Sequence, residues 1–376
     1  MKIVFTGGGT GGHFYPLIAV AEEIHEIVRE RKFLPPSLYY VAPDPYDERL
    51  LFENEIEFRQ SPAGKMRRYF SLLNITDSFK SFFGVMKTLL QLFSIFPDVV
   101  FSKGGFSSFP TVTAARILGI PVVIHESDAK PGRANLLASR HARAVAISYP
   151  EAAQYFPADK VALVGNPVRR QLRTLQKEGA QEFLKLEGGT PVILILGGSQ
   201  GSLRINDIVL EALPQLLERY QVIHQTGEKH FKSVEETSRV ILEKSPYANR
   251  YRPFPYLNEL ALRMSAGISD LIISRAGSGN IFEAATWGKP TILIPIPEDV
   301  SHDQRTNAFS YARSGAAVVI EEVNLSPHLL ASEVNRLMDN QGIRVEMSKA
   351  ALTFARPDAA RKIAEELIRI ALEHEK

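Results

Sequence analysis

The hydrophobic positions near the start of the chain change their spacing within a few residues. The run KIVF at residues 2–5 is continuously apolar, which is typical of a short buried strand. After a glycine-rich stretch, apolar residues recur at helical spacing at Leu17, Ile18, Ala21, Ile24 and Val28. The pattern therefore predicts a strand, a glycine loop and an amphipathic helix, the opening of a βαβ unit.

Further apolar runs follow through the first 150 residues, namely SLYYVA, DVVFSKGG, PVVIHES and AVAISY. They alternate with helical segments, which predicts a parallel sheet covered by helices on both faces.

The pattern restarts at PVILILGGSQGS, and QVIHQTG, LIISRAGSGN and TILIPIP continue it. The 376 residues are enough for two ordinary domains. We therefore expect an α/β protein of two Rossmann-like domains, divided near Gly165 and Pro167. Ligands of such sheets bind at the carboxyl ends of the strands, so the two domains are expected to face a cleft.

Composition narrows the class of protein. Hydrophobic residues make up 45% and charged residues 23%, which are globular values. A net charge of +2 does not favour a nucleic-acid partner. The sequence contains no cysteine, which excludes disulfides and thiolate metal sites. Without an apolar leader or a run of about 20 apolar residues, we expect a cytoplasmic protein, soluble or peripheral to the membrane.

The segment 64–97 differs from the rest because basic residues accompany many aromatic ones. From composition alone it is either a helix lying in a membrane interface or a core helix with a solvated basic rim. The candidate membrane patch consists of Lys65, Arg67, Arg68, Phe79, Lys80, Phe82 and Phe83.

The first glycine loop contains a formal G-x-G-x-x-G at Gly7, Gly9 and Gly12. A dinucleotide site would need an acidic residue at the end of the second strand, but Asp44 comes two residues after that strand. What remains is a flexible loop at a helix N-terminus, which favours anions. His13 beside it is either a general base near neutral pH or a capping or core histidine.

Two glycine turns of the second half repeat this arrangement, at LGGSQGS and at SRAGSGN. Glu283 follows the second turn by about one helical turn and could accept two hydrogen bonds from a ribose diol. Gln304 and Asn307 supply polar groups suited to sugar hydroxyls, whereas their spacing is poor for a metal site. In the first half, His125, Glu126, Asp128 and Asn135 follow a strand end and would line the opposite wall.

Together these motifs closely resemble the MurG family of UDP-N-acetylglucosamine transferases, which add the second sugar of the peptidoglycan precursor. The resemblance is carried in order by GGGTGGHFYP, GGFSSFP, GIPVVIHES, VGNPVR, LGGSQGS, SRAGSGNIFEAATWGKP and DQRTNA. It implies the GT-B fold, with an acceptor and membrane-facing domain at 1–164 and a UDP-sugar domain at 165–356. The C-terminal helix at 357–376 is expected to return to the first domain.

The resemblance also implies roles for individual residues, with no cofactor or metal. In the donor site, Glu283 would hold the ribose and Gln304 the sugar, with Asn307 nearby. The pyrophosphate would meet Gly198, Ser199, Ser278 and Gly279, Arg169 would match a donor-site arginine, and the backbone of Leu257 would touch the uracil.

On the acceptor side, Thr10, Gly11 and Gly12 would bind diphosphate, and His13 would take the proton from the acceptor hydroxyl. Asp128 and Glu126 are alternative bases. The family usually shows His-Glu-Gln-Asn where this chain reads HESD, so Asp128 stands in place of an asparagine. A carboxylate near a pyrophosphate is unfavourable unless Arg133 or Lys130 pairs with it.

The implied reaction is an inverting transfer from UDP-N-acetylglucosamine to the 4-hydroxyl of N-acetylmuramic acid in lipid I, a polyprenyl-pyrophosphoryl acceptor. It would take place at the cytoplasmic face of an anionic membrane. The alternatives are another UDP-sugar enzyme of the same fold, such as a glycolipid glycosyltransferase or an epimerase, a nicotinamide oxidoreductase, and a non-enzymatic sugar-nucleotide-binding scaffold.

Overall fold

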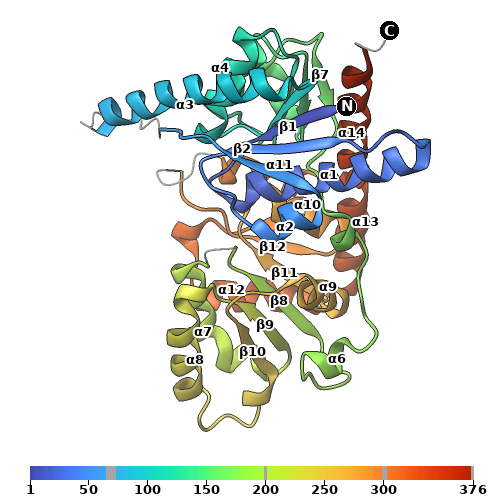
Figure 1. Ribbon diagram of the computed structural model, residues 1–376. Helices are drawn as coiled ribbons and strands as arrows, with labels where there is room; N and C mark the ends of the chain where they lie inside the picture. Colours follow the sequence, from blue (N-terminus) through green and yellow to red (C-terminus); the bar gives the residue numbers. More distant parts are fainter. Residues whose placement is uncertain (65–72, 199–200, 299–302, 374–376) are drawn as a thin grey trace. The chain divides into compact units, whose positions relative to one another are not determined.

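The computed structural model describes residues 1–64, 73–198, 201–298 and 303–373 (Figure 1). The chain divides into two units, Met1–Arg170 with Arg356–Lys376, and Gln171–Ala355. The division lies a few residues beyond the one expected at 164/165. It does so because Arg170 is held by helix α1 (Gly11–Arg31): its N–H donates to Glu22 at 2.9 Å and its guanidinium to Glu26 at 2.7 Å.

In the first unit the described residues form a seven-stranded parallel sheet in the order β3-β2-β1-β4-β5-β6-β7. Its strands are β1 (Lys2–Thr6), β2 (Ser37–Ala42), β3 (Ile56–Gln60), β4 (Val99–Ser102), β5 (Val122–Glu126), β6 (Ala144–Ile147) and β7 (Val161–Leu163).

Helices cover both faces of this sheet. Because side chains alternate along each strand, neighbouring strand residues pack against helices on opposite faces. Ile3 and Phe5 pack with α1 and α14, whereas Val4 packs with Leu92 on the other face. Besides α1, the helices are α2 (Glu48–Glu53), α3 (Leu73–Ile95), η1 (Phe106–Ser108), α4 (Phe109–Ile117), α5 (Arg133–Ser139), η2 (Pro150–Tyr155) and α14 (Ala359–Leu372).

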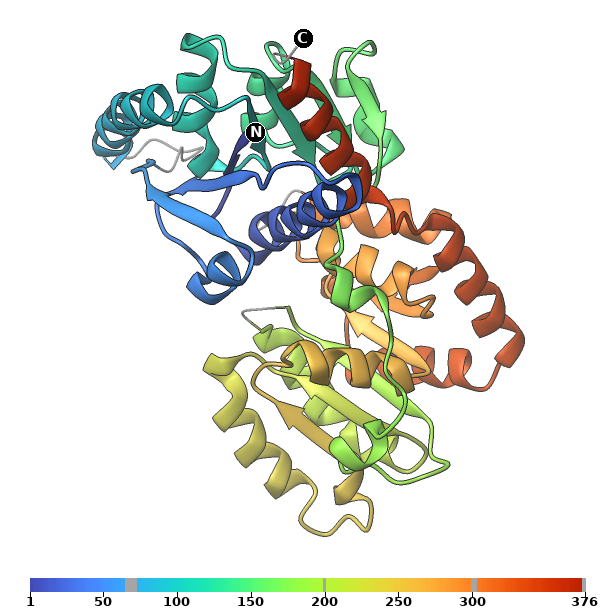
Figure 2. The same cartoon turned by 45° about the vertical axis from the view of Figure 1, so that its right-hand side comes forward.

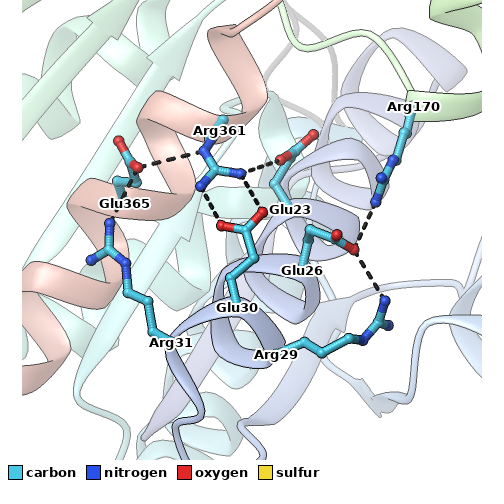
Figure 3. A network of polar contacts seen from close by, with 8 residues as sticks. All are labelled: Glu23, Glu26, Arg29, Glu30, Arg31, Arg170, Arg361 and Glu365. Carbon is cyan, nitrogen blue, oxygen red and sulfur yellow. Dashed lines mark hydrogen bonds and ion pairs between the residues drawn. The ribbon is translucent and has the colours of Figure 1, made fainter.

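The C-terminal helix α14 returns to the first unit and packs against α1, as expected from the sequence (Figure 1). Ala360, Ile363 and Leu367 bury one face of α14 in the core. At the rim, Arg361 bonds Glu30 at 2.6 Å and lies 4.0 Å from the buried Glu23 (Figure 3). The charged network therefore fixes the helix in register on α1.

The second unit contains a six-stranded parallel sheet in the order β10-β9-β8-β11-β12-β13. Its strands are β8 (Val192–Leu196), β9 (Gln221–Gln225), β10 (Tyr251–Phe254), β11 (Leu271–Ser274), β12 (Thr291–Leu293) and β13 (Ala317–Val319). The helices are η3 (Arg170–Arg173, at the junction), α6 (Ala180–Phe183), α7 (Leu203–Leu217), α8 (Glu228–Ile241), η4 (Ala248–Arg250), α9 (Glu259–Ile268), α10 (Ser278–Thr286), α11 (Gln304–Arg313), η5 (Glu322–Asn324), α12 (Pro327–Met338) and α13 (Gln341–Phe354).

Each sheet reverses its strand order beside its first strand, which is where ligands of open α/β sheets bind. In the first unit β1 lies between β2 and β4, and in the second β8 lies between β9 and β11 (Figure 2). The glycine loops that follow β1 and β4, and those that follow β8 and β11, therefore occupy the expected ligand edges.

No helix in the part of the chain that the structure describes is long and apolar enough to cross a membrane.

Candidate functional site

The first glycine loop packs tightly against the loop that follows β4. Gly7 and Gly9 have φ angles of 134° and 92°, which favour glycine. A Cβ on Gly7 would lie 2.9 Å from the Cβ of Lys103, and one on Gly8 would lie 2.9 Å from the hydroxyl of Tyr40. The loop leads into α1 at Gly11, so the positive end of the helix dipole lies beside it.

His13 stands in the first turn of α1, partly exposed. Its Nδ1 is 2.9 Å from the hydroxyl oxygen of Thr10, the residue that precedes the helix. A Cβ on Gly105 would lie 3.5 Å from Nε2, so this nitrogen faces the loop after β4. The ring lies among protein atoms although its edge meets solvent, and this loss of hydration together with the nearby Lys103 lowers the pKa of His13 to about 4, so its imidazole is neutral at pH 7.

Glu126 ends β5 and organises the loop that follows. Its carboxylate accepts hydrogen bonds from the N–H groups of Asp128 at 3.0 Å and Gly132 at 3.1 Å, and from Nδ2 of Asn135 at 3.0 Å. Burial and the proximity of Asp128 raise the pKa of Glu126 to about 7. Glu126 and Asn135 are thus buried parts of the loop framework, while Asp128 is half-buried.

Lys103, directly after β4, is a residue that the sequence reasoning missed. It is 1% exposed, and its Nζ lies 2.6 Å from Nδ1 of His125, 2.5 Å from Oγ of Ser127 and 3.3 Å from Oδ1 of Asn166. Burial lowers its pKa to about 7, while Glu126 and Asp128 favour the charged form. The available signal was a lysine between a buried strand and two glycines.

His125 lies beneath this cluster and is fully buried. Its Nε2 lies 2.9 Å from the carbonyl oxygen of Gly165. Burial and Lys103 lower its pKa well below the usual value, so it stays neutral.

Arg169 belongs to the first unit rather than to the expected second domain. Its guanidinium lies over the ring of Tyr15, with Cζ 4.6 Å from the ring centre, and so is held against α1. The structure thus joins Arg169, Thr10 and His13 to one helix of the first unit.

In the second unit, the loop after β8 is fixed by contacts of its backbone. Gly201 has a φ of 74°, and a Cβ there would lie 2.1 Å from the carbonyl oxygen of Thr226. Gln225 donates to the carbonyl of Gly198 at 3.1 Å and accepts from the N–H of Leu257 at 3.2 Å. Leu257 is therefore connected to this loop, and its side chain is buried; Ser199 lies outside the described residues.

The glycines at the start of α10 have open space where a side chain would begin. A Cβ on Gly277 or Gly279 would meet nothing within 4 Å, and Ser278 is the first residue of the helix. Glu283 lies one turn further along, half-buried. The open space in front of this helix N-terminus is suited to an anionic group.

Arg275 connects the loops at this edge. It donates to Oγ of Ser202 at 2.5 Å and to the carbonyl of Ile294 at 3.1 Å, and it pairs with Glu322 at 2.5 Å. Gln304, the first residue of α11, accepts from the N–H of Ile296 at 3.3 Å.

Asn307 lies one turn along α11 and is fully buried. The carboxyl edge of this sheet therefore carries Gly198, Ser278, Gly279, Glu283 and Gln304 together. Within the described ranges, no group of three or more His, Asp or Glu residues gathers as a metal site.

Helix α3 of the basic, aromatic segment has one buried face and one exposed face. Its inner face joins the core through Leu92 and Ile95. Its outer face leaves large apolar side chains in solvent, at spacings of three, four or seven residues: Phe79, Phe82, Phe83, Met86, Leu90, Phe93 and the following Phe96. Lys80 is exposed beside them, while Lys65, Arg67 and Arg68 lie outside the described residues. Exposed apolar stripes of this size are typical of interaction surfaces.

The chain matches two family descriptions and many relatives over most of its length. Residues 3–147 match the glycosyltransferase family 28 N-terminal domain, and residues 192–363 match the family 28 C-terminal domain. A UDP-N-acetylglucosamine–N-acetylmuramyl-(pentapeptide) pyrophosphoryl-undecaprenol N-acetylglucosamine transferase of Treponema denticola is 35% identical, with 92% of this chain and 89% of that protein covered. The enzyme of the same name from Clostridium kluyveri is 36% identical, with 96% and 97% covered.

Among solved structures, Acinetobacter baumannii MurG superposes with a TM-score of 0.74 at 26% identity, covering 98% of this chain and 99% of that one. Staphylococcus aureus MnaA, solved with UDP, has a TM-score of 0.70 at 16% identity, covering 97% and 95%, and shows only the shared fold. The expected GT-B fold class, with two Rossmann-like domains, is thereby confirmed.

We expect Gly201 and Gly279 to respond differently to alanine. Gly201→Ala combines a positive φ with a backbone clash, so it should lower the free energy of unfolding by more than about 1 kcal/mol. Gly279→Ala has open space in the first turn of a helix, so stability should be kept or slightly raised. Chemical denaturation of both variants measures this; equal losses would contradict the open space before α10.

Proposed function

The chain belongs to the family of UDP-N-acetylglucosamine–N-acetylmuramyl-(pentapeptide) pyrophosphoryl-undecaprenol N-acetylglucosamine transferases, and from this membership we propose that it makes the disaccharide of the lipid-linked peptidoglycan precursor. The observation that carries the proposal is an identity of 35% to 38% over more than nine-tenths of the chain. The glycine loops at both ligand edges support it.

The second domain is proposed to hold the donor, UDP-N-acetylglucosamine. The open N-terminus of α10 and the loop at Gly198 would receive the diphosphate through backbone N–H groups. Glu283 would accept the ribose hydroxyls, and Gln304 would contact the sugar. Because Gln225 connects Gly198 with Leu257, the loops for diphosphate and base would move as one.

The first domain is proposed to hold the acceptor, with its diphosphate at the N-terminus of α1. For His13 to act as a base through Nε2, its Nδ1–H must donate to the hydroxyl of Thr10. That arrangement leaves the lone pair on Nε2, the ring nitrogen near Gly105. Asn135 and Glu126 would support the loop, and Asp128 would lie beside the acceptor.

The proposed reaction is a single displacement. The 4-hydroxyl oxygen of N-acetylmuramic acid bonds to the anomeric carbon, its proton passes to His13, and the bond to the UDP oxygen breaks with inversion. The leaving diphosphate gains negative charge, which the N–H groups and dipole of a helix N-terminus stabilise. Such preorganised donors are worth about 3–4 kcal/mol each in other enzymes.

We further propose that the outer face of α3 rests on an anionic membrane at its cytoplasmic side. Six exposed apolar side chains between Phe79 and Phe93 would enter the interface, and Lys80 would meet the headgroups. The polyprenyl chain of the acceptor would lie in that membrane.

Purified protein should form the disaccharide lipid from UDP-N-acetylglucosamine and a short-chain lipid I analogue. His13→Ala should lower kcat by about 10²–10⁴-fold, because a positioned base is lost. Since the pKa of His13 is lowered to about 4, kcat/KM should show no His13-dependent fall between pH 8 and pH 5.

The acceptor-derived product is followed by chromatography, with Thr10→Ser as the matched variant that keeps the hydroxyl. An unchanged kcat in His13→Ala would refute the role of His13 as the base. Binding of UDP-N-acetylglucosamine without disaccharide formation would refute lipid I as the acceptor. Epimerised donor as product would favour the alternative enzyme of the same fold.

Glu283→Ala should raise the donor KM by about 10- to 100-fold, because it removes two hydrogen bonds to the ribose. The acceptor KM should change little. Glu346→Ala, an exposed glutamate of α13, is the control and should leave both constants unchanged. Unaltered donor binding in Glu283→Ala, measured by calorimetry with UDP, would disprove the ribose contact.

Replacing Phe82 and Phe93 together with serine should weaken binding to phosphatidylglycerol vesicles by about tenfold or more, because two exposed aromatic side chains no longer enter the interface. Phe52→Ser on α2 removes an even more exposed ring elsewhere and should have no effect. Vesicle co-sedimentation measures both, and lipid binding that survives the double change would argue against this face.

A further inference from the structure

His224 of β9 is a fully buried histidine that the reaction described above does not use, and it lies at the centre of a chain of side-chain hydrogen bonds. Its Nδ1 lies 2.9 Å from the hydroxyl oxygen of Tyr251 on β10. Its Nε2 lies 3.1 Å from Oδ1 of Asn206 on α7, and Nδ2 of Asn206 donates to the carbonyl oxygen of Thr226 at 3.0 Å. The chain therefore joins two strands, a helix and the residue that follows β9.

The direction of every hydrogen bond in this chain is fixed by its last acceptor. A backbone carbonyl only accepts, so the Asn206 amide presents its NH2 group to Thr226 and its oxygen to His224. That oxygen also only accepts, so Nε2 of His224 carries the proton and Nδ1 accepts from the Tyr251 hydroxyl. Burial lowers the pKa of His224 to about 3, so the ring is neutral, as this arrangement requires.

The Thr226 carbonyl also lies against the glycine loop that follows β8. A Cβ on Gly201 would come within 2.1 Å of this oxygen, so the two backbones are in direct contact. The N–H of Gly201 donates to the carbonyl of Gly198 at 3.1 Å, which joins the two described ends of the loop. Gly198 in turn accepts from Gln225, the neighbour of His224 in β9. Both ends of the loop therefore depend on β9 and the residue that follows it.

Asn206 lies in the first turn of α7, the helix that begins directly after this loop. Its backbone N–H donates at 2.9 Å to the carbonyl of Ser202, the residue that caps the helix. The positive end of the α7 dipole lies beside the loop, where the donor diphosphate is proposed to bind. Because the Asn206 side chain is tied to Thr226, the hydrogen bond from His224 helps to fix the start of this helix on β9.

We propose that His224 and Asn206 are positioning residues for the donor diphosphate, which hold the start of α7 and the loop at Gly198 and Gly201 by directing the Asn206 amide onto the Thr226 carbonyl. Both side chains are fully buried, so they act through the loop and not by touching the donor. The inference rests on the proposed donor site for its effect on binding, whereas its effect on the loop is measurable without any ligand.

The first test compares UDP binding to His224→Leu and His224→Gln by calorimetry. Leucine leaves the Asn206 oxygen buried without its donor, so the Kd for UDP should rise about tenfold. Glutamine keeps one N–H and one acceptor, so it should restore the affinity to within about threefold of the unaltered protein. An unchanged Kd in His224→Leu, or a glutamine variant as weak as the leucine variant, would overturn the proposal.

Tyr220→Phe is the matched control. Tyr220 lies just beyond the opposite end of α7, and its hydroxyl donates to Oδ1 of Asn335 at 2.8 Å. The change also removes a side-chain hydrogen bond of a buried residue in the same unit, but not one that reaches the glycine loop. UDP binding should therefore stay unchanged, and a loss equal to that of His224→Leu would contradict a specific role of the His224 chain.

Hydrogen exchange measured by NMR without ligand tests the loop itself. In His224→Leu the N–H of Gly201 should exchange about tenfold faster, because the Thr226 carbonyl against the loop loses its fixed donor, whereas β8 should keep its protection. Unchanged exchange at Gly201 would overturn the proposal. If the unaltered protein does not bind UDP, the proposed donor site is refuted, and exchange at Gly201 alone decides the positioning role.

Nitrogen-15 NMR of the unaltered protein provides a test that requires no variant to fold. At pH 7 the Nε2 of His224 should carry the proton and Nδ1 should be unprotonated, because Asn206 presents its oxygen to the ring. The opposite tautomer would overturn the proposal. If His224→Leu does not fold, Asn206→Ser is measured in its place, with the same expected losses of UDP affinity and of protection at Gly201, and unchanged values would again refute the role.

Discussion

Both halves of the molecule depend on the parallel pairing of two central strands. Thr6 of β1 lies opposite Ser102 of β4, and Leu196 of β8 lies opposite Ser274 of β11. Because parallel neighbours end at the same edge, each glycine loop emerges against the loop of its neighbour. The loops after β1 and β4 lie so close together that there is no room for a Cβ at Gly7. The glycine loops after β1 and β4, and those after β8 and β11, are placed by this constraint.

Local sequence patterns predicted those strands, loops and helices whose structure is determined by residues close together in the chain. The apolar run at the N-terminus became β1, and the glycine loop led into α1 at Gly11, with His13 in its first turn. Such features depend on strand periodicity and on the residues that begin a helix, and both signals lie within a few consecutive residues of the sequence. The glycine turns before α7 and α10 were predictable for the same reason.

Other features depend on contacts between distant segments, which a pattern does not contain. Lys103 looks like a solvated strand end in sequence, and its burial arises only when the loops carrying Ser127 and Asn166 close over it. Arg169 was expected in the second domain, but the ring of Tyr15 on α1 holds it in the first. For α3, composition left two alternatives open, because packing against β-strands decides which face is covered.

The electrostatics of the two ligand edges differ in kind. In the second domain the described anion-binding candidates are mostly neutral: helix N-termini, glycine N–H groups and a serine. The guanidinium of Arg275 there forms hydrogen bonds with Ser202 and a backbone carbonyl and an ion pair with Glu322, so it stabilises the loops. The first domain instead buries Lys103, whose amine contacts His125, Ser127 and Asn166.

A lipid-linked acceptor offers a reason for that difference, given the proposed function. A soluble nucleotide can reach a neutral diphosphate site from any direction, whereas a membrane-bound diphosphate is confined to the surface that α3 would contact. Helix α3 runs directly into β4, and β4 delivers Lys103 to the acceptor loops. The proposed membrane contact and Lys103 are therefore joined by one short stretch of chain, which ties the position of the acceptor loops to the helix that would lie on the lipid.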